Sequence, residues 1–353
     1  MQINSHPFLQ KLFLRISSLL VLFLAPTSLA NAHLRWFVDI DSPSAKAYQA
    51  AGQFHFDIVY LILLAGAVGF VIIAIMLDNL ARKNKMVDNL LNKPVHIPFH
   101  LEWRLVSILL GLMLMLNSHH GVLLAPNLPT SGAFTYKAAI IAQFVVGLLF
   151  LSQLSFVLSA IGTFCLATIT AIITPFEIMI DYVFEFGGII LAFYLIGPSM
   201  CRLDRILWPA YSSRNERLAV GVLALALGAQ LAELALHNKL MNPGLALIFM
   251  DDNSYLNFML LLGFSSFDNI YFVFAAAIAE LTLGTLLVFG VATRLVALGI
   301  GGVFMLTATI FGLHELLGHI PIMAVVLLVV LHGRDGSFLD LLRRSLIDIK
   351  ARA

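Results

Sequence analysis

Long apolar runs alternate with short polar stretches along almost the whole chain. A helix of roughly 20 apolar residues crosses the hydrocarbon core of a bilayer. The stretch 138–174 is too long for one helix, so we expect Ser152, Gln153 and Ser155 to mark a turn between two. The pattern therefore predicts an all-α fold, a polytopic membrane helix bundle with about nine transmembrane helices, at about 56–77, 105–124, 138–155, 157–175, 180–198, 218–236, 270–290, 295–313 and 320–332.

Composition supports the membrane assignment and excludes several functions. The chain of 353 residues is 60% hydrophobic and 12% charged, whereas soluble domains carry about 25% charged residues. It has no basic domain, nucleotide-binding motif or nucleophile triad, so we expect a lipid bilayer as partner and no nucleic acid or nucleotide. Cys165 and Cys201 lack metal-ligand spacing, and we interpret them as packing residues without a disulfide.

The first 32 residues are typical of an export signal. Lys11 and Arg15 precede an apolar run, 16–25, that is too short to span a bilayer, and Ala30-Asn31-Ala32 is a small-residue cleavage site. Cleavage after Ala30 also fits the small-residue rule. The alternative is an uncleaved anchor helix.

Basic residues predict the orientation of the chain. Lysines and arginines cluster after the first, fifth, seventh and ninth runs, and Lys137 and Lys239 are the lysines of the opposite loops. Cytoplasmic loops carry the excess of lysine and arginine in membrane proteins. We therefore expect a bacterial inner-membrane protein with a periplasmic mature N-terminus and a cytoplasmic C-terminus. The tail 334–353 is predicted to be a basic amphipathic helix on the inner leaflet.

The transmembrane body shows signs of duplication. Ala142-Gln143-Phe144-Val145-Val146-Gly147 resembles Ala279-Glu280-Leu281-Thr282-Leu283-Gly284 at an offset of 137 residues. Glu102-Trp103-Arg104-Leu105 resembles Asn215-Glu216-Arg217-Leu218 at an offset of 114, which places His119 over Glu233. Two parallel four-helix repeats would result, a pattern known among transporters. Chance similarity between apolar stretches is the alternative.

The second unit resembles the DoxX-like family of four-helix membrane proteins. The similarity lies in Glu280-x-x-x-Gly284, Leu287-x-x-Gly290-x-x-Thr293-Arg294 and the basic residue of His237-Asn238-Lys239. It covers about 216–332, and 102–200 only through the internal repeat. The resemblance implies a four-helix unit and, since some relatives are linked to quinone-coupled sulfur oxidation, a quinone. The predicted organisation is a signal peptide (1–32), an exported segment (33–55), a first helix and loop (56–98), repeat one (99–200), repeat two (214–333) and the tail (334–353).

Histidines gather at the predicted exported end of the spans. Imidazole is a common ligand for zinc, copper and iron. A mature terminus at His33 would offer an amine and an imidazole, which suits copper. We expect Gly318 and Pro321 to break a helix and leave two of these imidazoles near the surface. Simple hydrogen-bonding or water-facing histidines are the alternative. The candidate metal ligands are His33, His119, His120, His237, His314 and His319.

Carboxylates accompany these histidines and are candidate cofactor-binding residues or proton acceptors. Glu177, Asp181 and Glu185 form a stripe at helical spacing, and Glu233 lies one turn before His237. Three ionised carboxylates on one face repel, so they need a cation, a proton or an arginine nearby. Glu280 lies inside a span, where a protonated carboxyl bonded to a neighbouring helix is the alternative to a functional role.

Three functions remain open. The first is a His/carboxylate site on the periplasmic face that binds copper or another transition metal, or supports a quinone-linked redox step. The second is a transporter of a small solute or ion. The third is a scaffold that docks a periplasmic protein partner through the loop 237–269, which carries apolar side chains. No catalytic residue is assigned, so enzymatic activity stays open.

Overall fold

A computed structural model describes residue 54 and residues 57–333, except 96, 98–99, 127, 129–130 and 209–213. Within this part the chain is helical and contains no strand. The expected signal peptide, His33, His55 and the tail after residue 333 lie outside the described residues, as do the side chains of Glu177 and His314.

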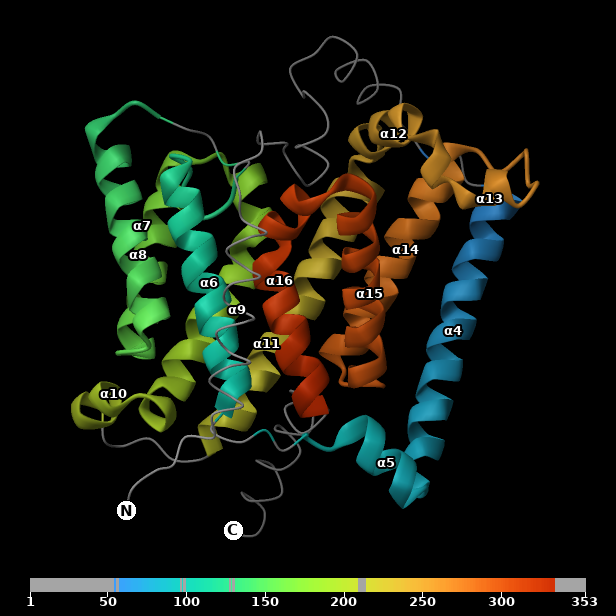
Figure 1. The fold of residues 1–353 in the computed structure, drawn as a ribbon. Helices are drawn as coiled ribbons and strands as arrows, with labels where there is room; N and C mark the ends of the chain where they lie inside the picture. The colour runs from blue at the N-terminus through green and yellow to red at the C-terminus, as the bar shows by residue number, and fades with distance from the viewer. Residues whose placement is uncertain are drawn as a thin grey trace, which may run out of the picture.

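In the part of the chain that the structure describes, nine long helices run side by side, as predicted (Figure 1). Eight of them contain a stretch long and apolar enough to cross a membrane, and the ninth, α16, has a shorter apolar part, Gly318–His332. The predicted turn around Gln153 is confirmed, since α7 ends at Ser152 and the Ser155 side chain caps α8. The long helices are α4 (Ile58–Lys83), α6 (Leu101–His119), α7 (Phe134–Ser152), α8 (Phe156–Ile173), α9 (Phe176–Met200), α11 (Arg214–Ala235), α14 (Asn269–Val288), α15 (Thr293–Phe311) and α16 (Leu313–His332).

Short helices lie at the two ends of the bundle (Figure 1). At one end, called the α5 end here, are α5 (Lys85–Asn92) and α10 (Arg202–Leu207). At the other, the α12 end, the predicted loop folds into a π-helix, η2 (Leu236–Met241), followed by α12 (Pro243–Asp252), a 3₁₀ turn (Ser254–Leu256) and α13 (Phe258–Leu261).

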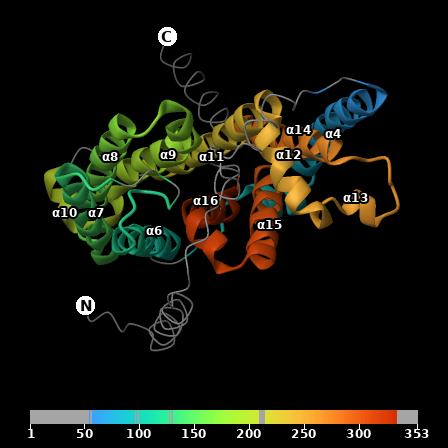
Figure 2. The same ribbon diagram turned by 90° about the horizontal axis from the view of Figure 1, so that it is seen from above.

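Four helices form the centre of the molecule. Helices α6 and α9 come from the first half of the chain and α11 and α16 from the second, and Figure 2 shows them grouped between the outer helices. Trp103 of α6 is fully buried and packs edge-on against Phe193 of α9, with ring centroids 5.8 Å apart. Both halves thus contribute to one core. By contrast α4 packs mainly on α14, and only 6% of its apolar stretch is buried.

The same close helix contact occurs in both halves. Helices α6 and α7 meet at Gly111 and Gly147, where an added Cβ on Gly147 would lie 2.8 Å from the Gly111 carbonyl oxygen. Helices α11 and α14 meet at Gly228 and Gly284, with 2.5 Å for the corresponding approach. The offset between Gly147 and Gly284 is the predicted 137 residues. The offset between Gly111 and Gly228 is 117 residues rather than the predicted 114. An offset of 117 would align His120 with His237, whereas the predicted offset aligned His119 with Glu233.

The expected helix break near Gly318 and Pro321 is wrong. Helix α16 begins at Leu313, after Gly312 at φ 90°, and continues through Pro321 to His332. Proline is tolerated inside transmembrane helices because neighbouring groups satisfy the freed backbone. His319 is consequently buried rather than near the surface, and its ring packs on Phe304 with centroids 4.7 Å apart.

Candidate functional site

A π-helical turn ends α11 and positions the residues of the site. The α-helix runs to Ala235, and the wider turn η2 then carries His237, Asn238 and Lys239. π-Helical turns are rare, and they occur frequently at functional sites. Three consecutive polar side chains turn away from solvent here: His237 and Lys239 are half-buried and Asn238 is buried.

Two carboxylates face the His237 imidazole. Its Nδ1 atom lies 3.4 Å from Oε1 of Glu233, one turn earlier on α11, and 3.6 Å from Oδ1 of Asp181 on α9. Asp181 is only 1% exposed. One ligand atom from each of the three residues lies within 4.8 Å of the other two. The α9–α11 interface therefore brings together three of the predicted site residues, and we call them the His237 cluster.

Amides hold these carboxylates in place. Asn238 Nδ2 donates to Asp181 Oδ1 at 3.0 Å, and Gln230 Nε2 donates to Glu233 Oε2 at 3.2 Å. The Gln230 side-chain oxygen also accepts from the backbone N–H of Glu185 at 3.1 Å. Both amides were missed in the sequence interpretation. Their only signal was a polar residue within an apolar run, at Gln230, one turn before Glu233.

The other predicted ligands do not join this cluster in the described part of the chain. His119 is exposed, His120 is half-buried, and their rings contact each other at 5.4 Å. Two groups of described residues bring three ligand atoms within 4.8 Å, and neither includes His119, His120 or His319. The predicted gathering of imidazoles thus reduces, among described side chains, to His237 with its two carboxylates.

Glu280 lies apart from the His237 cluster in an ion pair. Its carboxylate contacts the ammonium of Lys239, which extends from η2 toward α14. Gln143, which the predicted repeat aligns with Glu280, accepts from the backbone N–H of Leu124 at 2.7 Å and donates to the Val122 carbonyl at 3.0 Å. An ion pair in one half and neutral hydrogen bonds in the other hold each helix end to its neighbour.

An apolar cavity of about 330 Å³ lies between α4 and α14. It is lined by small and aliphatic residues and by Phe70, and Thr282 is the hydroxyl-bearing residue of this lining. Such a lining accepts a lipid or quinone tail, but a quinone head group also needs polar partners that orient it. The cavity therefore favours an apolar occupant and does not define a redox site.

The chemistry of the His237 cluster fits a divalent cation. Two carboxylates supply two negative charges, and a neutral imidazole supplies a nitrogen ligand. Among described residues the buried Nδ1 of His237 has no hydrogen-bond partner, although two acceptors face it. Three protein ligands would leave a coordination position for water or a substrate, as in catalytic zinc sites.

Comparison with known proteins shows a family similarity within the second half of the chain. The family model described as DoxX matches residues 239–314, which run from Lys239 through α12, α14 and α15 into the start of α16. No curated protein and no solved structure matches the chain. The match includes the Lys239–Glu280 ion pair and begins just after His237, so it leaves the His237 cluster outside. The chain is a multi-pass membrane protein whose residues 239–314 are similar to the DoxX family.

Proposed function

We propose that this protein binds a divalent transition-metal ion in the His237 cluster, on the exported face of the membrane. The arrangement of Nδ1 of His237, 3.4 and 3.6 Å from two carboxylate oxygens, carries the proposal. Ligand atoms around a tetrahedral zinc ion lie roughly 3.3 Å apart, because its bonds to nitrogen and oxygen are about 2.0–2.2 Å long. The three side chains need only small movements to hold such an ion.

The ligand set narrows the choice of ion. One imidazole with two carboxylates suits zinc, iron(II) or manganese better than copper(I), which prefers soft sulfur ligands. Copper at a mature terminus starting with His33 stays a separate prediction, since that residue lies outside the described part. A quinone-linked redox step through the cluster would need a redox-active ion, a requirement that iron(II) and manganese(II) meet and zinc does not.

Metal analysis of the full-length protein in detergent tests the proposal. After metal is stripped with a chelator, zinc titration should show one equivalent of zinc bound by the wild type at this site. The Asp181→Asn and His237→Ala variants should lose this equivalent. We expect affinity to fall by more than the ~10–100-fold that loss of an outer-shell partner causes. His119→Ala is the matched control, because that exposed histidine is outside the cluster. Unchanged zinc binding in the His237 and Asp181 variants would reject the proposal.

A buried carboxyl favours proton or ion transport as the second candidate function. Glu185 lies one turn after Asp181 on α9, and it is only 6% exposed inside a predicted span. Ionisable residues in such positions are costly and mark ion or proton pathways in many transporters. Proton-coupled uptake into vesicles that disappears in Glu185→Gln would support transport. Equal uptake by the variant would exclude a role for this carboxyl.

A further inference from the structure

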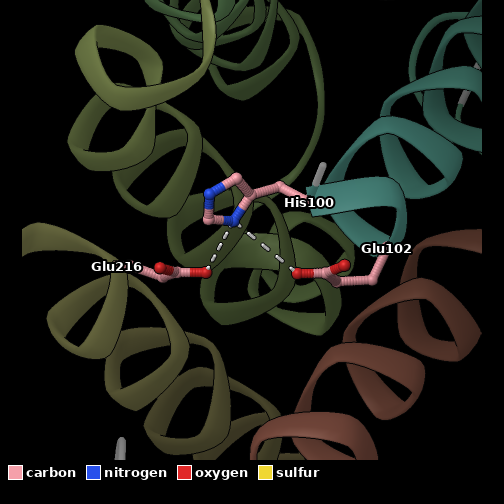
Figure 3. Close-up of side chains that lie close together, drawn as sticks. All are labelled: His100, Glu102 and Glu216. Carbon is pink, nitrogen blue, oxygen red and sulfur yellow. Dashed lines mark hydrogen bonds and ion pairs between the residues drawn. The ribbon is translucent and has the colours of Figure 1, made fainter. Parts of the chain in front are cut away.

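A second group of potential ligands lies at the opposite, α5 end of the bundle. It combines His100 and Glu102 at the start of α6, Glu216 in the first turn of α11 and His332 at the end of α16 (Figure 3 shows the first three). The residues come from both halves of the chain. None was among the predicted ligands, although Glu102 and Glu216 are matched in the repeat alignment.

From this geometry we propose a second divalent metal site, with His100, Glu102 and Glu216 as its ligands and His332 beside Glu102. Nδ1 of His100 lies 3.2 Å from Glu216 Oε1 and 4.0 Å from Glu102 Oε1. Nε2 of His332 lies 3.6 Å from the same Glu102 oxygen. These separations resemble the roughly 3.3 Å expected between ligands of a tetrahedral zinc ion. Figure 3 shows the two carboxylates pointing toward each other beneath the His100 ring.

A buried, unpartnered carboxylate oxygen points independently to a missing ligand. The side chain of Glu102 is only 4% exposed, and its Oε2 atom has no hydrogen-bond partner among the described residues. Burial of a carboxylate is expensive unless it is paired, hydrogen-bonded or coordinated to a metal. The other oxygen of Glu102, Oε1, faces the imidazoles, and a cation held by both oxygens would supply the compensation that the described protein groups do not give to Oε2.

The charges of the group also fit a divalent cation. One oxygen each of Glu102 and Glu216 lie within 4.8 Å of one another, close enough to repel when both are ionised. In the described part of the chain these two residues form ion pairs with histidines and with no lysine or arginine. The two carboxylates would balance the charge of a divalent ion, and a ligand set of imidazole and carboxylates suits zinc, iron(II) or manganese.

The backbone presents His100 for this role. His100 has φ 50° and ψ 43°, a left-handed conformation that is uncommon for residues other than glycine. Its side chain does not cap α6 and instead lies over the two carboxylates. The imidazole is 47% exposed and Glu216 is 26% exposed, so an ion can enter from solvent at this side. Glu102 and His332, at 4% and 15%, form the inner side of the site.

Cobalt titration of the full-length protein in detergent tests this second site separately from the His237 cluster. Cobalt(II) substitutes for zinc and reports its ligands through its visible spectrum. We expect two equivalents in the wild type. His100→Ala and Glu216→Gln should each remove one equivalent and leave the other, whereas His237→Ala should remove the complementary one. His100→Cys should restore binding and add the intense thiolate-to-cobalt absorption.

These outcomes decide between the two sites. If His100→Ala and Glu216→Gln bind as much cobalt as the wild type, with equal affinity, the second site is overturned even where the His237 cluster is confirmed. The two residues are partly exposed, so their variants test binding without disturbing the core. Glu102→Gln changes a buried group, and thermal unfolding of its metal-free form checks that it folds. A folded Glu102→Gln with wild-type affinity would equally contradict the proposal.

Discussion

Among single residues, His120 at the end of α6 makes the stability of the folded protein depend on pH. Burial lowers the pKa of His120 below its ordinary value of 6.5, and the neighbouring His119 lowers it further. The folded protein therefore prefers the neutral imidazole. In the unfolded chain the pKa returns to about 6.5, so His120's contribution to stability is complete above that pH. It is lost progressively as the pH falls from about 6.5 toward the lower, folded-state pKa.

An NMR titration of the histidine ring protons measures this shift. We expect the His120 midpoint to lie below 6.5, and His119→Asn to raise it part of the way, since burial is the larger cause. A wild-type midpoint at or above 6.5 would contradict the described burial. A midpoint unaffected by His119→Asn would show that the contact between the two rings carries no charge coupling.

Single residues also show where sequence reasoning stopped. The types of residue in the His237 cluster followed from polar side chains beside an apolar run. Which residues contact each other could not be predicted in the same way. Hydropathy indicates the depth of a residue in the membrane but not which neighbouring helix its side chain faces. The predicted repeat places His119 at the depth of Glu233, yet His119 is exposed and Glu233 lies 3.4 Å from the His237 imidazole. His100 escaped notice because its left-handed backbone has no signal in the sequence.

At the scale of helices, two glycine contacts set the approach of neighbours. An alanine Cβ at Gly284 would lie 2.5 Å from the Gly228 carbonyl oxygen, and helix α11 cannot yield without moving the His237 cluster on it. We expect Gly284→Ala to lower the free energy of unfolding by about 1–3 kcal/mol, the usual cost of overpacking. Denaturation in mixed detergent micelles measures the change.

Gly299→Ala on α15 is the matched control, because no atom lies within 4 Å of its added Cβ. Alanine is the better helix former, so the control should be neutral or more stable than the wild type. Equal stability of the two variants would mean that α11 and α14 do not approach closely. The duplication stays a prediction: the offset of 117 between Gly111 and Gly228 differs from the predicted 114 by three residues, which is nearly one helical turn.

Helix positions were predictable where lipid imposes the pattern. The nine long helices follow the apolar runs, because an apolar stretch of this length has few alternatives to a helix in a bilayer. The break expected at Pro321 failed because a membrane helix tolerates proline, and the turn instead occurs at Gly312. The fold of 237–269 was not predictable from hydropathy, since η2 and α12 depend on packing against α14.

At the scale of the whole molecule, the distribution of basic residues predicts that the α12 end faces the exported side. Cysteine labelling with a membrane-impermeant thiol reagent in intact cells tests this. The first variant is Met241→Cys at the α12 end, where Met241 is 73% exposed, and the second is Met86→Cys at the α5 end, where Met86 is 82% exposed. We expect the first to be labelled in intact cells and the second only after permeabilisation. The reverse pattern would contradict the orientation.

The native cysteines allow this experiment with little background. Burial raises the pKa of the Cys201 thiol to about 11, so it stays protonated and unreactive at the pH of labelling. Cys165 is exposed on α8 and is replaced by serine in the background used for both variants. Neither cysteine forms a disulfide, in agreement with the sequence interpretation.

A metal ion bound in the His237 cluster can be located directly in a crystal. Crystals grown with zinc and measured at the zinc absorption edge would locate bound ions by their anomalous scattering. We expect a peak about 2.0–2.2 Å from Nδ1 of His237 and from one oxygen each of Asp181 and Glu233. A folded protein that shows its zinc elsewhere, with no peak between α9 and α11, would contradict it.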